Sequence, residues 1–209
     1  MSLRHALLAL LTAGPMTGYD LAKVFERSVD YTWHAPHSQI YPELRRMESD
    51  GLVEAELSPR GEKGTKRVYA ITPTGRHELR VWVATPSPIE RVRDAARLRC
   101  TYLELVSYDD ARRFFAAHLD HYEQAERDWS RHARQIEQLE TPLIKARLAA
   151  PDTGDKEAAV AYKVHVYRGL AAQARLEVEW AREGISLVDR LAAGVGDLTD
   201  VASAQGATE

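Results

Sequence analysis

Three stretches in the first part of the chain carry apolar residues at helical spacing: residues 3–11, 18–27 and 38–50. Two strand-like stretches follow, residues 53–57 and 66–71, and the loop between them, residues 59–65, contains two glycines, as hairpin loops often do. Thr72 and Pro73 then predict a fourth helix, because threonine caps a helix and proline suits its first position. In this order, these elements are the parts of a winged helix-turn-helix.

The second part of the chain is predicted to be almost entirely helical. Two closely spaced prolines, Pro86 and Pro88, interrupt any helix and separate it from the first part. A helix is expected over residues 89–106, and Ser107 caps the next one. Along that next helix five large apolar residues recur at intervals of seven: Phe115, Tyr122, Trp129, Ile136 and Leu143.

A long last helix is expected over residues 156–193. Its apolar residues are spaced alternately by four and three, which is the pattern of a heptad seam. At about 1.5 Å per residue this helix is too long for so small a domain to bury all of its apolar residues, so a second copy of the chain is expected to cover them. We therefore expect a homodimer held through Tyr122, Trp129, Ile136, Val164, Tyr167, Val178 and Ile185.

The predicted fold class is mostly α with a small β-wing. A winged helix-turn-helix domain is expected over residues 1–85 and a helical dimerisation domain over residues 86–193. The remaining residues, 194–209, are small and polar, and we expect this tail to fray.

Pro42 leaves two alternatives open for the third helix. Ile40, Leu44 and Met47 fall at i, i+4 and i+7, so they face inward, and Gly51 ends the helix. A proline deep in a helix removes a hydrogen bond and clashes with the preceding turn. The helix therefore either starts late, near Gln39, or is bent in its first turns.

Charge is unevenly distributed along the 209 residues, whose net charge is −3. Residues 1–85 hold 11 lysines and arginines against 10 acidic residues, and the remainder holds 17 against 21. Four cations gather near the predicted hairpin loop, where Glu62 is the one acid: Arg60, Lys63, Lys66 and Arg67. A small overall charge therefore hides one cationic loop.

Neither an enzyme nor a metal protein is indicated. The sequence has no GxSxG elbow, HExxH motif or phosphate-binding loop, and we expect no cofactor. His118 and His121 lie three residues apart, but Asp120 and Glu123 do not complete a metal site, so a surface face is the better interpretation. Cys100 is the single cysteine, which excludes an internal disulfide and favours a buried, inert thiol. No apolar run is long enough to span a bilayer and no signal peptide is indicated, so a cytoplasmic protein is expected.

Several segments in order resemble the PadR family of bacterial transcriptional regulators. They are residues 18–21 (GYDL), residues 39–48 (QIYPELRRME), residues 51–53 (GLV) and residues 69–75 (YAITPTG). Two departures are Met47, where the family usually has leucine, and residues 35–37, where a serine cap is more usual. The resemblance implies a dimeric regulator and, in some members, a small aromatic or hydrophobic effector. Trp129 and Tyr167 are the candidate effector contacts.

In a winged helix-turn-helix the third helix enters the major groove and the wing lies on the adjacent backbone of double-stranded DNA. The predicted DNA contacts are Ser38, Gln39, Tyr41, Pro42, Arg45, Arg46, Lys63, Lys66 and Arg67. Gln39 could read adenine, and Arg45 could pair with guanine or a phosphate. Alternatively, Tyr41 and Pro42 pack the motif.

The expected function is sequence-specific DNA binding by a homodimer, more often a repressor, on a pseudo-palindromic operator. The hypothesis includes release from DNA by a small hydrophobic or aromatic effector. Two alternatives are a protein-interaction scaffold, which the wing cations disfavour, and a small hydrolase or metal enzyme, which the missing motifs disfavour.

Overall fold

The computed structural model describes residues 3–28, 37–60, 64–86, 94–151 and 153–205. The chain forms two compact units, the first made of Met1–Ile89 and Gln138–Ala161 and the second of Glu90–Glu137 and Tyr162–Glu209. The expected division near residue 86 agrees with the point where the chain first passes from the first unit to the second. It does not account for the return of Gln138–Ala161 to the first unit, which the sequence analysis assigned to the helical domain.

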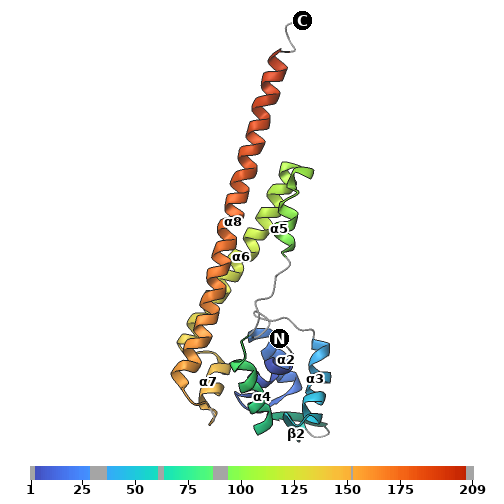
Figure 1. Ribbon diagram of the computed structural model, residues 1–209, viewed down its shortest axis with the longest axis vertical. Coiled ribbons are helices and arrows are strands. Elements are labelled where there is room, and N and C mark those ends of the chain that lie inside the picture. Colours follow the sequence, from blue (N-terminus) through green and yellow to red (C-terminus); the bar gives the residue numbers. More distant parts are fainter. Residues whose placement is uncertain (1–2, 29–36, 61–63, 87–93, 152, 206–209) are drawn as a thin grey trace. The chain divides into compact units, whose positions relative to one another are not determined.

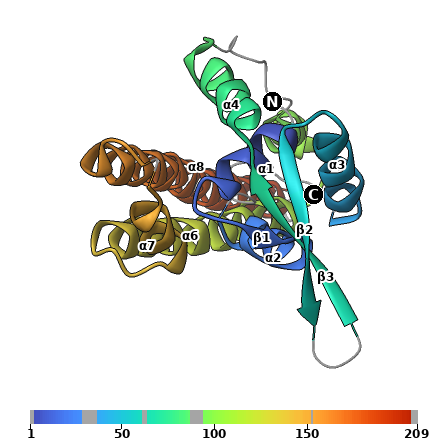
Figure 2. The same cartoon turned by 90° about the horizontal axis from the view of Figure 1, so that it is seen from below.

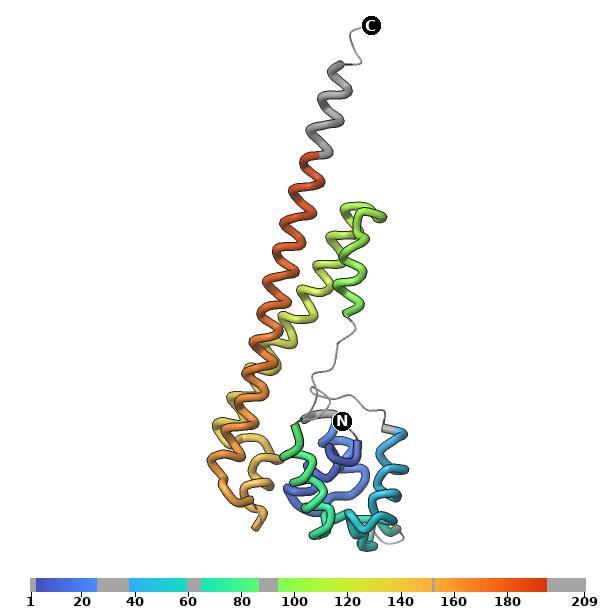
Figure 3. Tube along the Cα trace, in the orientation of Figure 1, coloured from blue at the N-terminus to red at the C-terminus, as the bar shows by residue number. Residues whose placement is uncertain are grey.

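The elements of the first unit match the predicted winged helix-turn-helix. Its described elements are α1 (Leu3–Leu11), β1 (Met16–Thr17), α2 (Gly18–Ser28), α3 (His37–Ser49), β2 (Val53–Arg60), β3 (Gly64–Ile71), α4 (Pro73–Ala84) and α7 (Pro142–Ala149). Figure 3 traces α1, α2 and α3 in shades of blue. The predicted helix over residues 3–11 has the observed bounds, and both strands extend further into the hairpin than their patterns indicate.

The sheet has three antiparallel strands in the order β1-β3-β2. The hairpin of β2 and β3 runs from Val53 opposite Ile71 to Arg60 opposite Gly64, and it projects past α2 as the wing (Figure 2). On the other side of β3, Met16 of β1 lies opposite Tyr69. The sequence analysis missed β1 because a strand of two residues has no periodicity to detect.

One apolar core joins α1, α2 and α3. The side chains that are at most 1% exposed are Leu7, Leu8, Leu11, Leu21, Phe25, Ile40, Leu44 and Met47. The predicted inward face of α3 is therefore confirmed. Burial of each such side chain stabilises the fold by about 1.5–3 kcal/mol.

The third helix does not start late, which removes one of the two alternatives for Pro42. It begins at His37 and continues through Pro42 to Ser49. Proline has no N–H to donate, so the second turn lacks one backbone hydrogen bond. The helix ends as predicted: Gly51 has φ +71°, and the Leu52 N–H donates to the Met47 carbonyl at 2.9 Å.

The start of α4 is fixed by capping and by a close backbone contact. The Thr72 hydroxyl accepts a hydrogen bond from the Gly75 N–H at 3.1 Å and donates to the Gly51 carbonyl at 2.7 Å. Pro73 occupies the first helical position, as predicted. A Cβ on Gly75 would lie 2.1 Å from the Leu52 carbonyl oxygen, so only glycine fits there.

Helix α7 packs against the core of the first unit, although α5 and α6 of the second unit separate it from that core in the sequence. Leu143 packs against that core, and Arg147 donates to the Thr12 carbonyl at 3.3 Å. The prediction that Leu143 continues the helix that starts after Ser107 is wrong. The helix ends at Glu137, Leu139 adopts the left-handed φ of 57°, and Thr141 caps α7 by accepting from the Ile144 N–H.

The second unit is built on two long helices. Its described elements are α5 (Ala95–Cys100), η1 (Leu103–Leu105), α6 (Tyr108–Glu137) and the larger part of α8 (Lys156–Gln205). Helices α6 and α8 lie side by side (Figures 1 and 2). The predicted single helix over residues 89–106 is wrong in its described part, because α5 ends at Cys100, where the Thr101 hydroxyl donates to the Leu98 carbonyl at 2.8 Å. The predicted end of the last helix at residue 193 is also wrong, since α8 continues to Gln205.

The predicted seam of α8 packs on α6 of the same chain. Its buried residues are Val164, Tyr167, Ala171, Ala174, Val178, Ala181 and Val188. The Phe115 ring lies so close to Gly184 that a Cβ there would be 2.3 Å from it. Ion pairs flank the seam, among them Arg182 with Glu123 at 2.7 Å. Within the described residues, no helix combines the length and apolarity that a bilayer crossing requires.

We expect Gly75→Ala to lower the stability of the first unit by about 3 kcal/mol, because the new methyl group must displace the Leu52 carbonyl. Gly169→Ala is the control, since a Cβ there meets nothing within 4 Å and should stabilise α8 by roughly 0.5–1 kcal/mol. Hydrogen-exchange mass spectrometry reads the two units separately. Unchanged protection of α4 in Gly75→Ala would contradict this account of the close contact.

Candidate nucleic-acid interface

The outward face of α3 is polar and open. Because Ile40, Leu44 and Met47 point into the core, the intervening residues point out. The exposed residues are Ser38, Gln39, Tyr41, Pro42, Arg45 and Arg46. These are the six positions that the sequence analysis predicted as contacts from this helix, and the fold brings them together on one face.

Helix α3 is held at its middle and at its C-terminal end by one arginine of α1. The Nε atom of Arg4 lies 3.1 Å from Oε1 of Glu43, and its Nη2 atom lies 2.7 Å from Oδ2 of Asp50. Glu43 is in the second turn of α3 and Asp50 follows its last residue. This pairing adds an orientational constraint to the apolar packing of α3, so its outward face has a defined direction.

The wing is tied to the same helix. Arg67 of β3 forms an ion pair with Glu48 of α3, and its guanidinium lies 5.8 Å from the centre of the Tyr69 ring. Lys66 is exposed and, like Arg45, has no ion pair with any described residue. Lys63, the third predicted wing contact, lies outside the described residues. Arg67 therefore braces the wing, whereas the charges of Lys66 and Arg45 remain available to a ligand.

A hollow of about 520 Å³ lies between the start of α2, α3 and β3. Tyr19, Tyr41, Arg45 and Lys66 are among its lining residues. Tyr41 packs closely, since a Cβ on Gly18 would lie 2.7 Å from its ring, yet its side chain is 45% exposed. Tyr41 thus packs against Gly18 with one part of its ring accessible, and its contact with DNA stays a prediction.

Tyr19 is the residue of this hollow that the sequence analysis missed. It is 67% exposed and occupies the first turn of α2. The cap of α2 explains its position: the Asp20 N–H donates to the Thr17 hydroxyl at 3.1 Å, and that hydroxyl donates to the Asp20 carboxylate at 2.7 Å. The available signal was a residue in the turn just after the threonine, outside the apolar face of the helix.

The hollow thus has a polar helix, α3, on one side and the cationic hairpin on the other. A single α-helix fits the major groove, and lysine and arginine beside it can hold phosphates. Amide and guanidinium groups on the helix can read base edges. This arrangement is chemically suited to double-stranded DNA.

Comparison with known proteins agrees with this geometry. Residues 7–81 match the model of the transcriptional regulator PadR-like family. The negative transcriptional regulator PadR of Bacillus subtilis (strain 168) is 34% identical over 114 residues, which are 54% of this chain and 63% of that relative. The crystal structure of Bacillus subtilis PadR in complex with operator DNA has a TM-score of 0.70 and 26% identity, with 89% of this chain and 98% of that chain covered.

Residues 7–81 belong to the PadR-like family of transcriptional regulators. The resemblance noted in the sequence is thus confirmed. The matched region spans less than two thirds of the curated relative's length. Bacillus subtilis PadR in complex with p-coumaric acid is also similar, with a TM-score of 0.64, 26% identity and coverage of 90% of this chain and 95% of that chain.

The predicted effector contacts of this PadR-like chain lie in the second unit. Trp129 is half-buried, and Tyr167 is 7% exposed with its ring 4.5 Å from that of His132. Burial lowers the pKa of His132, so its ring favours the neutral form. An effector role for Trp129 and Tyr167 stays a prediction.

The predicted dimerisation residues also lie in the second unit. Ile136, Val164, Tyr167 and Val178 are buried within the single chain, and Tyr122, Trp129 and Ile185 are half-buried. Their packing therefore holds α6 against α8. A contact between protomers stays a prediction for these seven residues.

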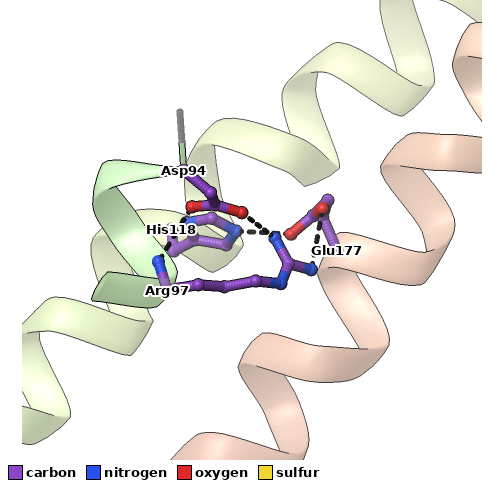
Figure 4. A network of polar contacts seen from close by, with 4 residues as sticks. All are labelled: Asp94, Arg97, His118 and Glu177. Atoms are coloured by element: carbon purple, nitrogen blue, oxygen red, sulfur yellow. Dashed lines mark hydrogen bonds and ion pairs between the residues drawn. The ribbon is translucent and has the colours of Figure 1, made fainter. Parts of the chain in front are cut away.

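His118 belongs to a polar network (Figure 4), not to a surface face. Its Nε2 atom lies 3.0 Å from Oε2 of Glu177, and Arg97 donates to Oε1 of the same carboxylate at 3.0 Å. Arg97 also pairs with Asp94 at 2.6 Å and lies 4.9 Å from the centre of the Trp180 ring. Sequence reasoning missed this network because 59 and 80 residues separate Glu177 from its two partners.

The network also changes the electrostatics around it. The backbone N–H and then the guanidinium of Arg97 hold the pKa of Asp94 below its usual value. Burial, and next the charge of Glu177, raise the pKa of Tyr122. With three elements joined at one carboxylate, the network attaches α5 to α6 and α8.

Proposed function

We propose that this chain is a homodimeric, sequence-specific DNA-binding regulator that represses transcription from a pseudo-palindromic operator. The observation that carries the proposal is the hollow between α3 and the wing, with Arg45 and Lys66 on its walls and no described residue neutralising either. The complex of the similar Bacillus subtilis PadR with operator DNA supports this proposal, and the description of that relative as a negative regulator supports repression.

In the proposed complex, α3 lies in the major groove and the hairpin lies along the neighbouring backbone. Gln39 and Arg45 read base edges, because their side chains present hydrogen-bonding groups that suit adenine and guanine. Ser38, Tyr41 and Arg46 hold the helix on the phosphates, while Lys63 and Lys66 anchor the wing without sequence preference. A two-fold dimer then requires half-sites about one helical turn apart.

The surface proposed to join two copies is the second apolar face of α8. Leu176, Leu187 and Leu191 are 66%, 46% and 51% exposed. At 3.6 residues per turn they lie within about 60° of one another, on the side of the helix opposite the seam. Leu98 and Leu105 in the same unit are 63% and 76% exposed. Apolar side chains this exposed gain most from burial against a second copy of the chain.

Control by a small effector completes the proposal. The similar Bacillus subtilis PadR has been crystallised with p-coumaric acid, which is an aromatic carboxylic acid. A ligand of that kind would act by favouring a state whose two recognition helices no longer match the operator spacing. Footprinting on the DNA upstream of the protein's own gene tests the function, and the absence of any protected site there would contradict it.

Arg45→Ala should weaken binding to the footprinted site by about 10-fold to 100-fold and relax base preference there, since a base contact of this kind is worth ~1–3 kcal/mol. Lys66→Ala should weaken binding to all sequences alike and reduce the salt slope by about one. Fluorescence anisotropy at several salt concentrations separates the two effects. Arg80→Ala, an exposed arginine on α4, is the control, and equal losses in all three variants would contradict the assignment.

Glu48→Gln should strengthen binding to any DNA and steepen its salt dependence, because it releases Arg67 from its ion pair and leaves it available to a phosphate. Glu54→Gln makes the same charge change at an exposed position of β2. If both variants gain affinity equally, net charge alone is responsible and the bracing role of Glu48 is wrong.

Leu187→Glu combined with Leu191→Glu should convert the dimer to a monomer, since burying two carboxylates in an apolar interface is costly. Light scattering after size-exclusion chromatography gives the mass. Leu57→Glu, at a 71% exposed leucine of the wing, is the matched control. A double variant that stays dimeric with native helix content would show that the interface lies elsewhere.

A further inference from the structure

Arg147 of α7 joins three segments of the first unit. Its Nη1 atom donates to the Thr12 carbonyl at 3.3 Å and to the Thr153 hydroxyl at 3.2 Å. Thr12 directly follows the last residue of α1, and Thr153 lies three residues before the start of α8. Thr153 is 5% exposed, and its hydroxyl donates in turn to the Arg147 carbonyl. One side chain therefore links the end of α1, helix α7 and the segment that leads into α8.

The contact with Thr12 is made where a cation is favoured. The last carbonyls of a helix have no partner within the helix and carry the negative end of its dipole. An arginine beside such an end satisfies these carbonyls and is attracted to the dipole. The last turn of α1 contains no basic residue of its own. Arg147, which is 135 residues away in the sequence, supplies that cation from α7.

Helix α1 is also the element that holds the recognition helix α3. Leu8 and Leu11 of α1 lie in the same apolar core as the inward side chains of α3. At the start of α1, Arg4 pairs with Glu43 at 3.1 Å and with Asp50 at 2.7 Å. Because α1 is one helix of nine residues within a close-packed core, a constraint on its end also restrains its start. Arg147 and Arg4 thus act on opposite ends of the same short helix.

The chain connects α7 directly to the long helices. It crosses between the two units after residues 89, 137 and 161, so the last two crossings bracket α7. Leu143 packs on the core of the first unit and Ile144 is 1% exposed, which anchors the first turn of α7. Arg147 adds a polar attachment one turn later, beside the segment that enters α8.

We propose that Arg147 is a positioning residue for operator binding, which acts through Thr12 and Thr153 to make affinity depend on the spacing of the two half-sites. This role rests on the proposed function, because spacing matters only to a dimer that contacts two half-sites. With the Arg147 contacts in place, the two α3 helices of a dimer fit one spacing. Without them each first unit is tethered more loosely, fits several spacings and gains less from the second half-site.

Fluorescence anisotropy with the full chain and three DNA duplexes tests this role. The duplexes are the footprinted operator, the same operator with one half-site scrambled, and the operator with one base pair added between the half-sites. The added base pair turns one half-site by about 34° around the DNA axis. Arg147→Ala should lose about 10-fold in affinity for the operator and stay within about 2-fold of the wild type on the single half-site. The affinity penalty for the added base pair should shrink by about 3-fold.

Lys145→Ala, at an exposed position of the same helix, is the matched control and should bind all three duplexes like the wild type. Thr153→Val removes the hydroxyl that Arg147 contacts and should shift the three affinities in the same direction, and it decides the question if Arg147→Ala loses its native circular dichroism. Equal losses on the operator and on the single half-site would show a role in stability alone and overturn the proposal. An unchanged operator affinity and spacing penalty would also overturn it. Failure of the proposed function would appear separately, as the absence of a site protected by the wild type.

Discussion

The burial of Ile40, Leu44 and Met47 is the constraint on which the rest of the first unit depends. These three side chains are each 0% exposed, so the rotation of α3 about its axis is set by the core. That rotation decides that Gln39 and Arg45 face solvent. Arg4 then holds the middle and the C-terminal end of the helix through Glu43 and Asp50. A polar face is useful for recognition only when its direction is defined, and here the apolar face defines it.

Local rules made much of the first unit predictable from the sequence. The caps at Thr17 and Thr72, the stop at Gly51 and the inward face of α3 depend on residues within one or two helical turns of each other. Contacts between distant segments left no such trace. The return of α7 to the core through Leu143, and the convergence of Arg97 and His118 on Glu177, depend on packing across 59 or more residues. The same limit applies to the candidate site: its outward residues were predictable, whereas the pairing of Arg67 with Glu48 was not.

The long helix α8 shows how one correct pattern can serve a different contact. The heptad spacing is real, and its alanines are buried as a seam should be, but the helix that covers them belongs to the same chain. A stripe of apolar residues indicates that another helix covers it, but it does not indicate whether that helix belongs to the same chain or to a second copy. Once the seam is satisfied by α6, the exposed Leu176, Leu187 and Leu191 on the opposite side become the surface that still lacks cover.

The wing divides its cations between two physical tasks. Arg67 pairs with Glu48 and holds β3 against α3, while Lys66 is exposed and has no ion pair with any described residue. The net charge of −3 limits attraction to DNA in general, so affinity has to come from a few well-placed groups. Because Arg67 is paired with Glu48, the strand that carries Lys66 is attached to the helix that carries Arg45.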